Sequence, residues 1–148
     1  MLPAPPVLPD RLAHTLVRHG LRETPARRAV LALLSGRGYA LTGAEVEREI
    51  SGGIDRVTLY RTLKSFEEHG LVHRVPDDAD GLRYAACSIE CTARAHFDNH
   101  VHFKCGVCRR TYCLNQVPIP AVQLPDGFWA ERRDYLLVGT CQLCRLAG

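Results

Sequence analysis

The sequence predicts an α+β fold in which an N-terminal winged helix-turn-helix precedes a small C-terminal α/β domain that is closed by zinc. Two observations lead to this prediction. The first 86 residues contain apolar stripes at helical spacing and then a hairpin pattern, whereas the last third contains short strands and two Cys-X-X-Cys pairs. Helices followed by a two-stranded hairpin are typical of a winged helix, and paired cysteines at this spacing are typical of zinc sites.

Four helices are predicted before residue 70. Thr24 is a capping residue directly before Pro25, and proline is favoured in the first turn of a helix. Thr42 and Glu45 form a capping box, and Asp55 can cap the last helix. Glycine follows the first, third and fourth helices, where it can end them. The predicted helices span residues 11–19, 25–34, 43–50 and 56–69.

After the fourth helix the pattern changes from helical to extended. Residues 71–75 and 82–86 flank Pro76-Asp-Asp-Ala-Asp-Gly81, a segment with strong turn chemistry. A small helical bundle with an attached hairpin is the alternative for this half.

Three prolines between residues 118 and 125 leave little room for a helix there, because proline lacks a backbone donor and clashes with the preceding turn. Further strands are expected at 100–105, 110–114 and 135–140.

Composition limits the partners and the compartment. The chain has 148 residues, 46% of them hydrophobic, and a formal net charge of only +3, which by itself does not indicate a nucleic-acid partner. No apolar run approaches the roughly 20 residues that cross a bilayer, and residues 1–9 do not resemble a signal peptide. Seven cysteines, an odd number, fit a reducing compartment, so we expect a cytoplasmic protein without a membrane partner. The expected organisation is a disordered lead at 1–10, a winged-helix domain at 11–86, a hinge at 87–99 and a second domain at 100–148.

The two Cys-X-X-Cys pairs predict a structural zinc site. Each pair places two thiolates on one tight turn, and two such turns close a tetrahedral set. Four protein thiolates leave no position open for water or substrate, so the site should stabilise the fold. A disulfide framework and scattered core cysteines are the alternatives. The predicted ligands are Cys105, Cys108, Cys141 and Cys144.

The fourth predicted helix has polar and aromatic side chains on the face opposite its apolar stripe. In a helix-turn-helix, such a face enters the major groove, where arginine reads guanine through two hydrogen bonds. In an isolated helix, solvation alone would explain the same face. Arg27 and Arg28 could add phosphate contacts. The residues predicted to contact DNA are Arg22, Arg56, Tyr60, Arg61 and Lys64.

A second metal site is predicted around His100 and His102, which lie two residues apart and therefore share one face of a strand. Taken alone, the pair could equally be exposed sheet histidines. Other imidazole and thiol groups in the sequence favour a metal site, because these ligands suit zinc. Cys113, by contrast, is expected to be a buried strand residue. The further candidate ligands are His73 in the first wing strand, Cys87 after the second, and Cys91 and His96 as possible extra ligands.

Jointly, these segments resemble the ferric uptake regulator (Fur) superfamily of metal-responsive bacterial repressors. The resemblance extends over about residues 12–144, with the motifs in family order. The matching motifs are Gly20-Leu-Arg-Glu-Thr-Pro-Ala-Arg27, Val57-Thr-Leu-Tyr-Arg-Thr-Leu63, Gly70-Leu-Val-His-Arg74, His100-Val-His-Phe-Lys-Cys-Gly-Val-Cys108 and Gly139-Thr-Cys-Gln-Leu-Cys144. The resemblance implies a winged helix, a hinge, a C-terminal α/β dimerisation domain, and a homodimer that binds palindromic operator DNA when it is metal-loaded.

The resemblance also implies roles for particular residues. Tyr60 and Arg61 match the family's base-reading pair, and Arg22 matches a basic residue that reaches the minor groove. The four paired cysteines match its structural zinc site. Iron-sensing members use a histidine and a glutamate at the positions of Ala40 and Ala85, which cannot coordinate. The zinc uptake regulator branch is the most similar, and its sensory ligands would correspond here to His73, Cys87, His100 and His102.

The expected function is a zinc-responsive transcriptional repressor with a structural Zn²⁺ and no small-molecule substrate. A second, regulatory divalent metal is expected, and the resemblance indicates that it is also Zn²⁺. A sensor of iron, manganese or peroxide is the alternative within the same family. A zinc-ribbon transcription adaptor and a zinc hydrolase are more distant alternatives. A hydrolase needs an open coordination position and a general base, and Glu90 is the only glutamate between residues 69 and 130.

Overall fold

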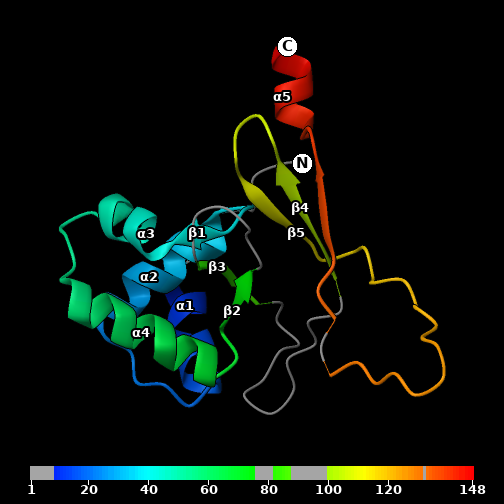
Figure 1. Ribbon diagram of the computed structural model, residues 1–148. Helices are drawn as coiled ribbons and strands as arrows, with labels where there is room; N and C mark the ends of the chain where they lie inside the picture. Colours follow the sequence, from blue (N-terminus) through cyan, green and yellow to red (C-terminus); the bar gives the residue numbers. More distant parts are fainter. Residues whose placement is uncertain (1–8, 76–81, 88–99, 132) are drawn as a thin grey trace.

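The computed structural model describes residues 9–75, 82–87, 100–131 and 133–148. In Figure 1, the first four helices and first three strands form one half of the molecule, and the remaining elements form the other. None of the helices in these ranges is long and apolar enough to cross a membrane. The helices are α1 (Pro9–Arg18), α2 (Pro25–Gly36), α3 (Gly43–Glu49), α4 (Arg56–Glu68) and α5 (Gln142–Ala147). The strands are β1 (Leu41–Thr42), β2 (Val72–Val75), β3 (Arg83–Ala86), β4 (Val101–Cys105), β5 (Thr111–Leu114) and β6 (Leu136–Gly139).

Helices α2, α3 and α4 begin where local chemistry predicts, whereas α1 begins at Pro9, two residues before the predicted start. The Thr24 hydroxyl accepts a bond from the backbone N–H of the third residue of α2, and the Asp55 carboxylate accepts one from the third residue of α4. Thr42 and Glu45 make both hydrogen bonds of a capping box, at 3.1 and 2.8 Å. Directly after α4, Gly70 has φ 76°, a left-handed conformation that glycine adopts without a Cβ clash. These local bonds satisfy backbone groups that a helix end would otherwise leave unpaired.

One apolar core holds the N-terminal half together. Leu16, Val30, Val46, Leu59 and Phe66, from all four helices, are fully buried. Complete burial of such a side chain contributes about 1.5–3 kcal/mol relative to exposure. Because α3 and α4 both insert side chains into this core, packing sets the angle between the two helices of the helix-turn-helix.

Each half contains a three-stranded sheet. In the N-terminal sheet the order is β1-β3-β2, and in the C-terminal sheet it is β5-β4-β6, with β4 antiparallel to β5 and parallel to β6. The five predicted strands agree with the structure to within one residue at each end. The sequence reading missed β1 and α5. β1 has only two residues, which is too short to show an alternating pattern.

The long connection between β5 and β6 contains no helix among its described residues, as its prolines predict. In Figure 1 this connection loops away from both sheets. The predicted fold class is confirmed: a winged helix precedes a small α/β domain that contains the four paired cysteines. The predicted domain boundaries stay predictions, since most of the lead and of the hinge lies outside the described residues.

The two halves contact each other beside β1. The backbone N–H of Ala40 donates to the carbonyl of Thr111 at 2.7 Å. Tyr39 meets Tyr112 edge to face, with ring centroids 6.1 Å apart, and the Arg110 guanidinium lies 4.4 Å from the centre of the Tyr39 ring. These contacts place the wing strands beside β4 and β5, which is what brings ligands from both halves together.

Candidate metal centres and nucleic-acid interface

The four paired cysteines converge at one edge of the C-terminal sheet. Because β4 and β6 are parallel neighbours, the turns that follow them emerge at the same edge, with Cys105 paired to Gly139. Cys105 and Cys108 belong to the first turn, whereas Cys141 and Cys144 lie at the start of α5. The four sulfur atoms all lie within 4.8 Å of one another. This arrangement matches the predicted four-thiolate set.

Hydrogen bonds favour the thiolate form of two of these four cysteines. Backbone N–H groups, that of Cys141 first, lower the pKa of Cys105 to about 6. The backbone N–H of Cys144 lowers the pKa of Cys141, whose sulfur also accepts a bond from the Tyr112 hydroxyl at 3.6 Å. The hydrogen bond with Cys141 instead raises the pKa of Cys144 to about 12. Four thiols this close can be ionised together only around a cation, and four thiolates suit a structural zinc ion.

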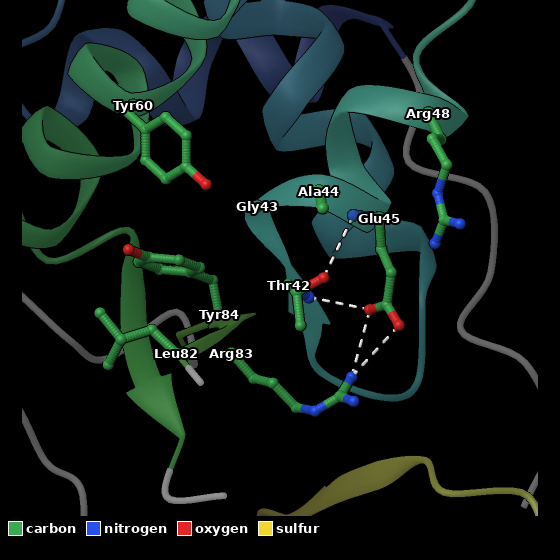
Figure 2. Close-up of a pocket in the computed structure, with 9 residues that line it drawn as sticks. All are labelled: Thr42, Gly43, Ala44, Glu45, Arg48, Tyr60, Leu82, Arg83 and Tyr84. Carbon is green, nitrogen blue, oxygen red and sulfur yellow. Dashed lines mark hydrogen bonds and ion pairs between the residues drawn. The ribbon is translucent and has the colours of Figure 1, made fainter. Parts of the chain in front are cut away.

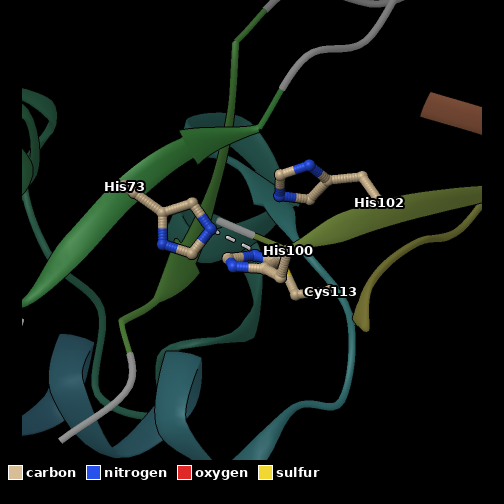
Figure 3. Close-up of side chains that lie close together, drawn as sticks. All are labelled: His73, His100, His102 and Cys113. Atoms are coloured by element: carbon tan, nitrogen blue, oxygen red, sulfur yellow. Dashed lines mark hydrogen bonds between the residues drawn. The ribbon is translucent and has the colours of Figure 1, made fainter. Parts of the chain in front are cut away.

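A second cluster joins ligands from three strands (Figure 3). His73 comes from β2, His100 and His102 come from the start of β4, and Cys113 comes from β5. One ligand atom from each lies within 4.8 Å of the other three. The three histidines are only 3–7% exposed. Three buried imidazoles and one half-buried thiol at these distances are a donor set that fits a tetrahedral zinc ion.

Cys113 is the functional candidate that the sequence reading missed. Its sulfur lies 3.5 Å from Nε2 of His73. In the β4–β5 ladder Cys113 stands directly opposite His102, so the two side chains share one face of the sheet. Only the register reveals this pairing, since a single cysteine in a strand has no distinguishing spacing.

Cys87, predicted as a sensory ligand, contacts His73 from the other side of its ring. Its sulfur lies 3.4 Å from Nδ1 of His73, whereas Cys113 lies beside Nε2. Among the described residues, the four-ligand cluster does not include Cys87. The possible extra ligands Cys91 and His96 lie outside the described residues.

Ala40 and Ala85, the positions at which the resemblance expects ligands of an iron sensor, carry only methyl side chains. Ala40 and Ala85 are buried at 0% and 7% exposure and pack with Val75 in a small apolar cluster, against which Cys113 packs. An alanine offers no atom that binds a metal. Neither position can therefore contribute a ligand to an ion bound by the histidine cluster.

The outer face of α4 is solvent-exposed, as a recognition helix requires. Arg61 and Lys64 are exposed, and Tyr60 is 47% exposed. Arg56 pairs with Glu47 at 3.4 Å, but exposed pairs of this kind contribute little and exchange readily for other anions. Arg22 is also exposed, and it lies in the connection between α1 and α2 and not on α4. The structure thus leaves all five predicted DNA-contacting side chains accessible.

A pocket of about 480 Å³ lies where α3, α4 and β3 meet (Figure 2). Tyr60 of α4 borders it on one side, and Leu82 and Tyr84 border it on the wing side. Arg83 reaches across from β3 to Glu45 at 3.1 Å, with only 7% of its side chain exposed. This ion pair and the capping box together tie the wing to the start of α3.

These features define a class of protein, a winged helix joined to a small domain with a four-cysteine metal site. A sequence model of the Ferric uptake regulator family matches residues 18–124, well over half of the chain. The chain belongs to this family. Its members are metal-responsive regulators.

Solved structures share the fold. The zinc uptake regulator complexed with zinc and DNA is 19% identical, with a TM-score of 0.62 over 93% of this chain and 93% of that chain. Holo XcZur is 19% identical, with a TM-score of 0.61 over 93% of this chain and 96% of that chain. The Vibrio cholerae ferric uptake regulator is 17% identical, with a TM-score of 0.58 over 87% and 98% of the two chains. No curated protein matches the sequence.

Proposed function

We propose that this protein is a zinc-responsive transcriptional repressor, which binds palindromic operator DNA as a cytoplasmic homodimer when it is metal-loaded. The observation that supports this most directly is the cluster of His73, His100, His102 and Cys113 within 4.8 Å. His73 lies in the wing, whereas the other three lie in the C-terminal half. A zinc ion bound by these residues would supply a bond between the DNA-binding half and the rest of the chain.

The donor set favours zinc over iron as the regulatory metal. Imidazole and thiolate ligands suit zinc, and a half-buried thiol beside three buried histidines fits a tetrahedral site. Ala40 and Ala85 supply no ligand at the positions that iron-sensing relatives use. Two solved structures of the same fold are a zinc uptake regulator with zinc and DNA and the holo form of XcZur.

The chain's own residues suggest how the site acts on DNA binding. When His73 is held against His100 and His102, β2 stays beside β4, and the core fixes α4 relative to β2. In a homodimer this would fix the distance between two α4 helices, which must match successive major grooves. Metal and operator DNA would then favour the same state, and each would tighten the other.

Exposed apolar side chains in the C-terminal half support the homodimer. Phe128 is 70% exposed and Trp129 is 88% exposed, both in the connection between β5 and β6. In β6, Leu137 and Val138 are 44% and 66% exposed. Burial of such exposed apolar side chains against a second subunit would favour association. The four-cysteine site would stabilise this half by binding a structural zinc ion.

A binding assay tests the proposal. Operators are selected from random duplex DNA with the zinc-loaded protein, and affinity is then measured with added zinc and after mild chelation. The wild type should bind about 5- to 150-fold more tightly with zinc, the usual size of such coupling. The double variant His100→Ala, His102→Ala should remain folded and keep its structural zinc, yet lose the response. His14→Ala, which removes an exposed histidine of α1, is the matched control.

Three results would count against the proposal. A double variant that responds like the wild type would remove these histidines from the sensor. A wild type that responds to iron or manganese and not to zinc would assign the regulatory site to another metal. Binding to DNA that is unchanged by chelation would instead favour a transcription adaptor.

A further inference from the structure

Gly43 and Tyr60 are in contact at the junction of the two helices of the helix-turn-helix. Gly43 is the buried first residue of α3. A Cβ atom placed there would lie 2.6 Å from Oη of Tyr60, 2.9 Å from Cζ and 3.0 Å from Cε1. Real Cβ atoms essentially never lie under 3.0 Å from a non-bonded atom, so an alanine at position 43 would have to displace the Tyr60 ring.

The backbone does not require glycine at this position. Gly20, Gly52, Gly53 and Gly70 have positive φ angles, but Gly43 does not. The start of α3 is already capped by Thr42 and Glu45. Alanine normally stabilises a helix relative to glycine. Position 43 is therefore glycine because Tyr60 fills the space that a larger side chain would need.

This contact fixes the position of the Tyr60 ring but leaves the ring partly exposed. Figure 2 shows the Tyr60 hydroxyl pointing towards the start of α3, with Tyr84 of the wing on the other side of the pocket. Tyr60 nevertheless remains 47% exposed on α4, next to the exposed Arg61. One edge of the ring rests against α3, and the remainder is available to a partner. An aromatic side chain held in one position loses less conformational freedom when it binds.

We infer that Gly43 is a specificity-determining position, which holds the Tyr60 ring at a fixed place for contact with one base edge of the operator. The inference rests on the proposed DNA-binding function and adds a residue that does not itself reach DNA. Gly43 acts by positioning Tyr60. A methyl group at position 43 would push the ring outward and alter the sequence preference where Tyr60 meets the DNA.

The test compares Gly43→Ala, Tyr60→Ala and the double variant, with Gly36→Ala as the control. Gly36 ends α2 and has no atom within 4 Å of an added Cβ. Each zinc-loaded protein is measured on the operator selected by the wild type, on its single base-pair variants and on random DNA. Thermal unfolding of each protein is recorded in parallel.

Gly43→Ala should weaken operator binding about tenfold, the usual cost of one mismatched base pair, while random DNA is bound as before. The lost preference should fall at the base pairs that Tyr60→Ala also affects. In the Tyr60→Ala background, Gly43→Ala should cause no further loss and should raise the thermal midpoint, because the helix gains a better residue without a collision.

Three results would overturn the inference. In the first, Gly43→Ala binds the operator and its variants like the wild type. In the second, it loses the same affinity whether or not Tyr60 is present. In the third, it destabilises the fold equally in both backgrounds. A wild type that selects no DNA sequence would refute the proposed function and this inference together, whereas the three results above leave the proposed function intact.

Discussion

Replacement of His73 by alanine should separate metal binding from the control of DNA binding. In the proposed sensory cluster, His73 is the ligand that comes from the wing, while His100, His102 and Cys113 come from the C-terminal half. His73→Ala leaves these three ligands in place, so zinc should still bind, though more weakly. The bond between the halves would be lost.

The expected magnitude follows from this division of ligands. If the coupling free energy is about 1–3 kcal/mol, zinc should tighten wild-type operator binding about 5- to 150-fold. With no wing ligand, His73→Ala should show a ratio of about 1 even when zinc saturates its remaining ligands. Linkage requires the reciprocal effect, so operator DNA should raise the zinc affinity of the wild type by the same factor and leave that of His73→Ala unchanged.

The assay measures both sides of this linkage. Fluorescence anisotropy reports operator affinity with and without saturating zinc, and competition with a chromophoric chelator reports zinc affinity with and without operator. His73 is only 6% exposed, so thermal unfolding must first establish that the variant is folded. A folded, zinc-saturated His73→Ala protein with full coupling would falsify the reasoning, because the wing ligand would then be unnecessary.

Three further predictions concern the fold and the DNA interface. The double variant Cys105→Ser, Cys141→Ser should be zinc-poor by metal analysis and largely unfolded or monomeric by size-exclusion chromatography, because the metal closes a loop of 32 intervening residues. A folded dimer with full zinc content would contradict this. Arg61→Ala should cost about 1–3 kcal/mol on the selected operator and leave binding to random DNA nearly unchanged, and an equal loss on both would argue against base readout. Glu45→Ala should lower the free energy of unfolding, measured in urea, by about 1 kcal/mol because the cap of α3 is lost. Loss of the ion pair with Arg83 should add part of the roughly 3–5 kcal/mol expected for breaking a buried pair, since Arg83 stays buried while Glu45 is 28% exposed. Glu45→Gln, which can keep the cap, should cost less, and equal losses would remove the ion pair from the explanation.

Helix starts and the paired cysteines could be predicted because their causes are local. A capping residue and its partner lie three positions apart, as Thr42 and Glu45 do, so the sequence itself brings them together. The same holds for each Cys-X-X-Cys turn. That the two turns meet depends on β4 and β6 being parallel neighbours, but four thiols at this spacing leave few other arrangements that satisfy zinc.

The exposed face of α4 could also be predicted, because a helix repeats every 3.6 residues. Leu59, Leu63 and Phe66 mark the buried face, and the residues between them must point outward. The position of Tyr60 could not be predicted in this way. Its contact with Gly43 depends on the angle between α3 and α4, which the shared core sets.

The sequence by itself determined most of the helices and strands, the family and the identity of most candidate ligands, since these follow from local spacing and residue chemistry. Only the tertiary structure decided how the ligands are grouped. It placed Cys113 opposite His102, and it put Cys87 and Cys113 on different sides of the His73 ring. The physical reason is that strand register and the docking of the two halves depend on contacts between residues far apart in the chain, and a shift of one residue would turn a ligand to the opposite face of its sheet.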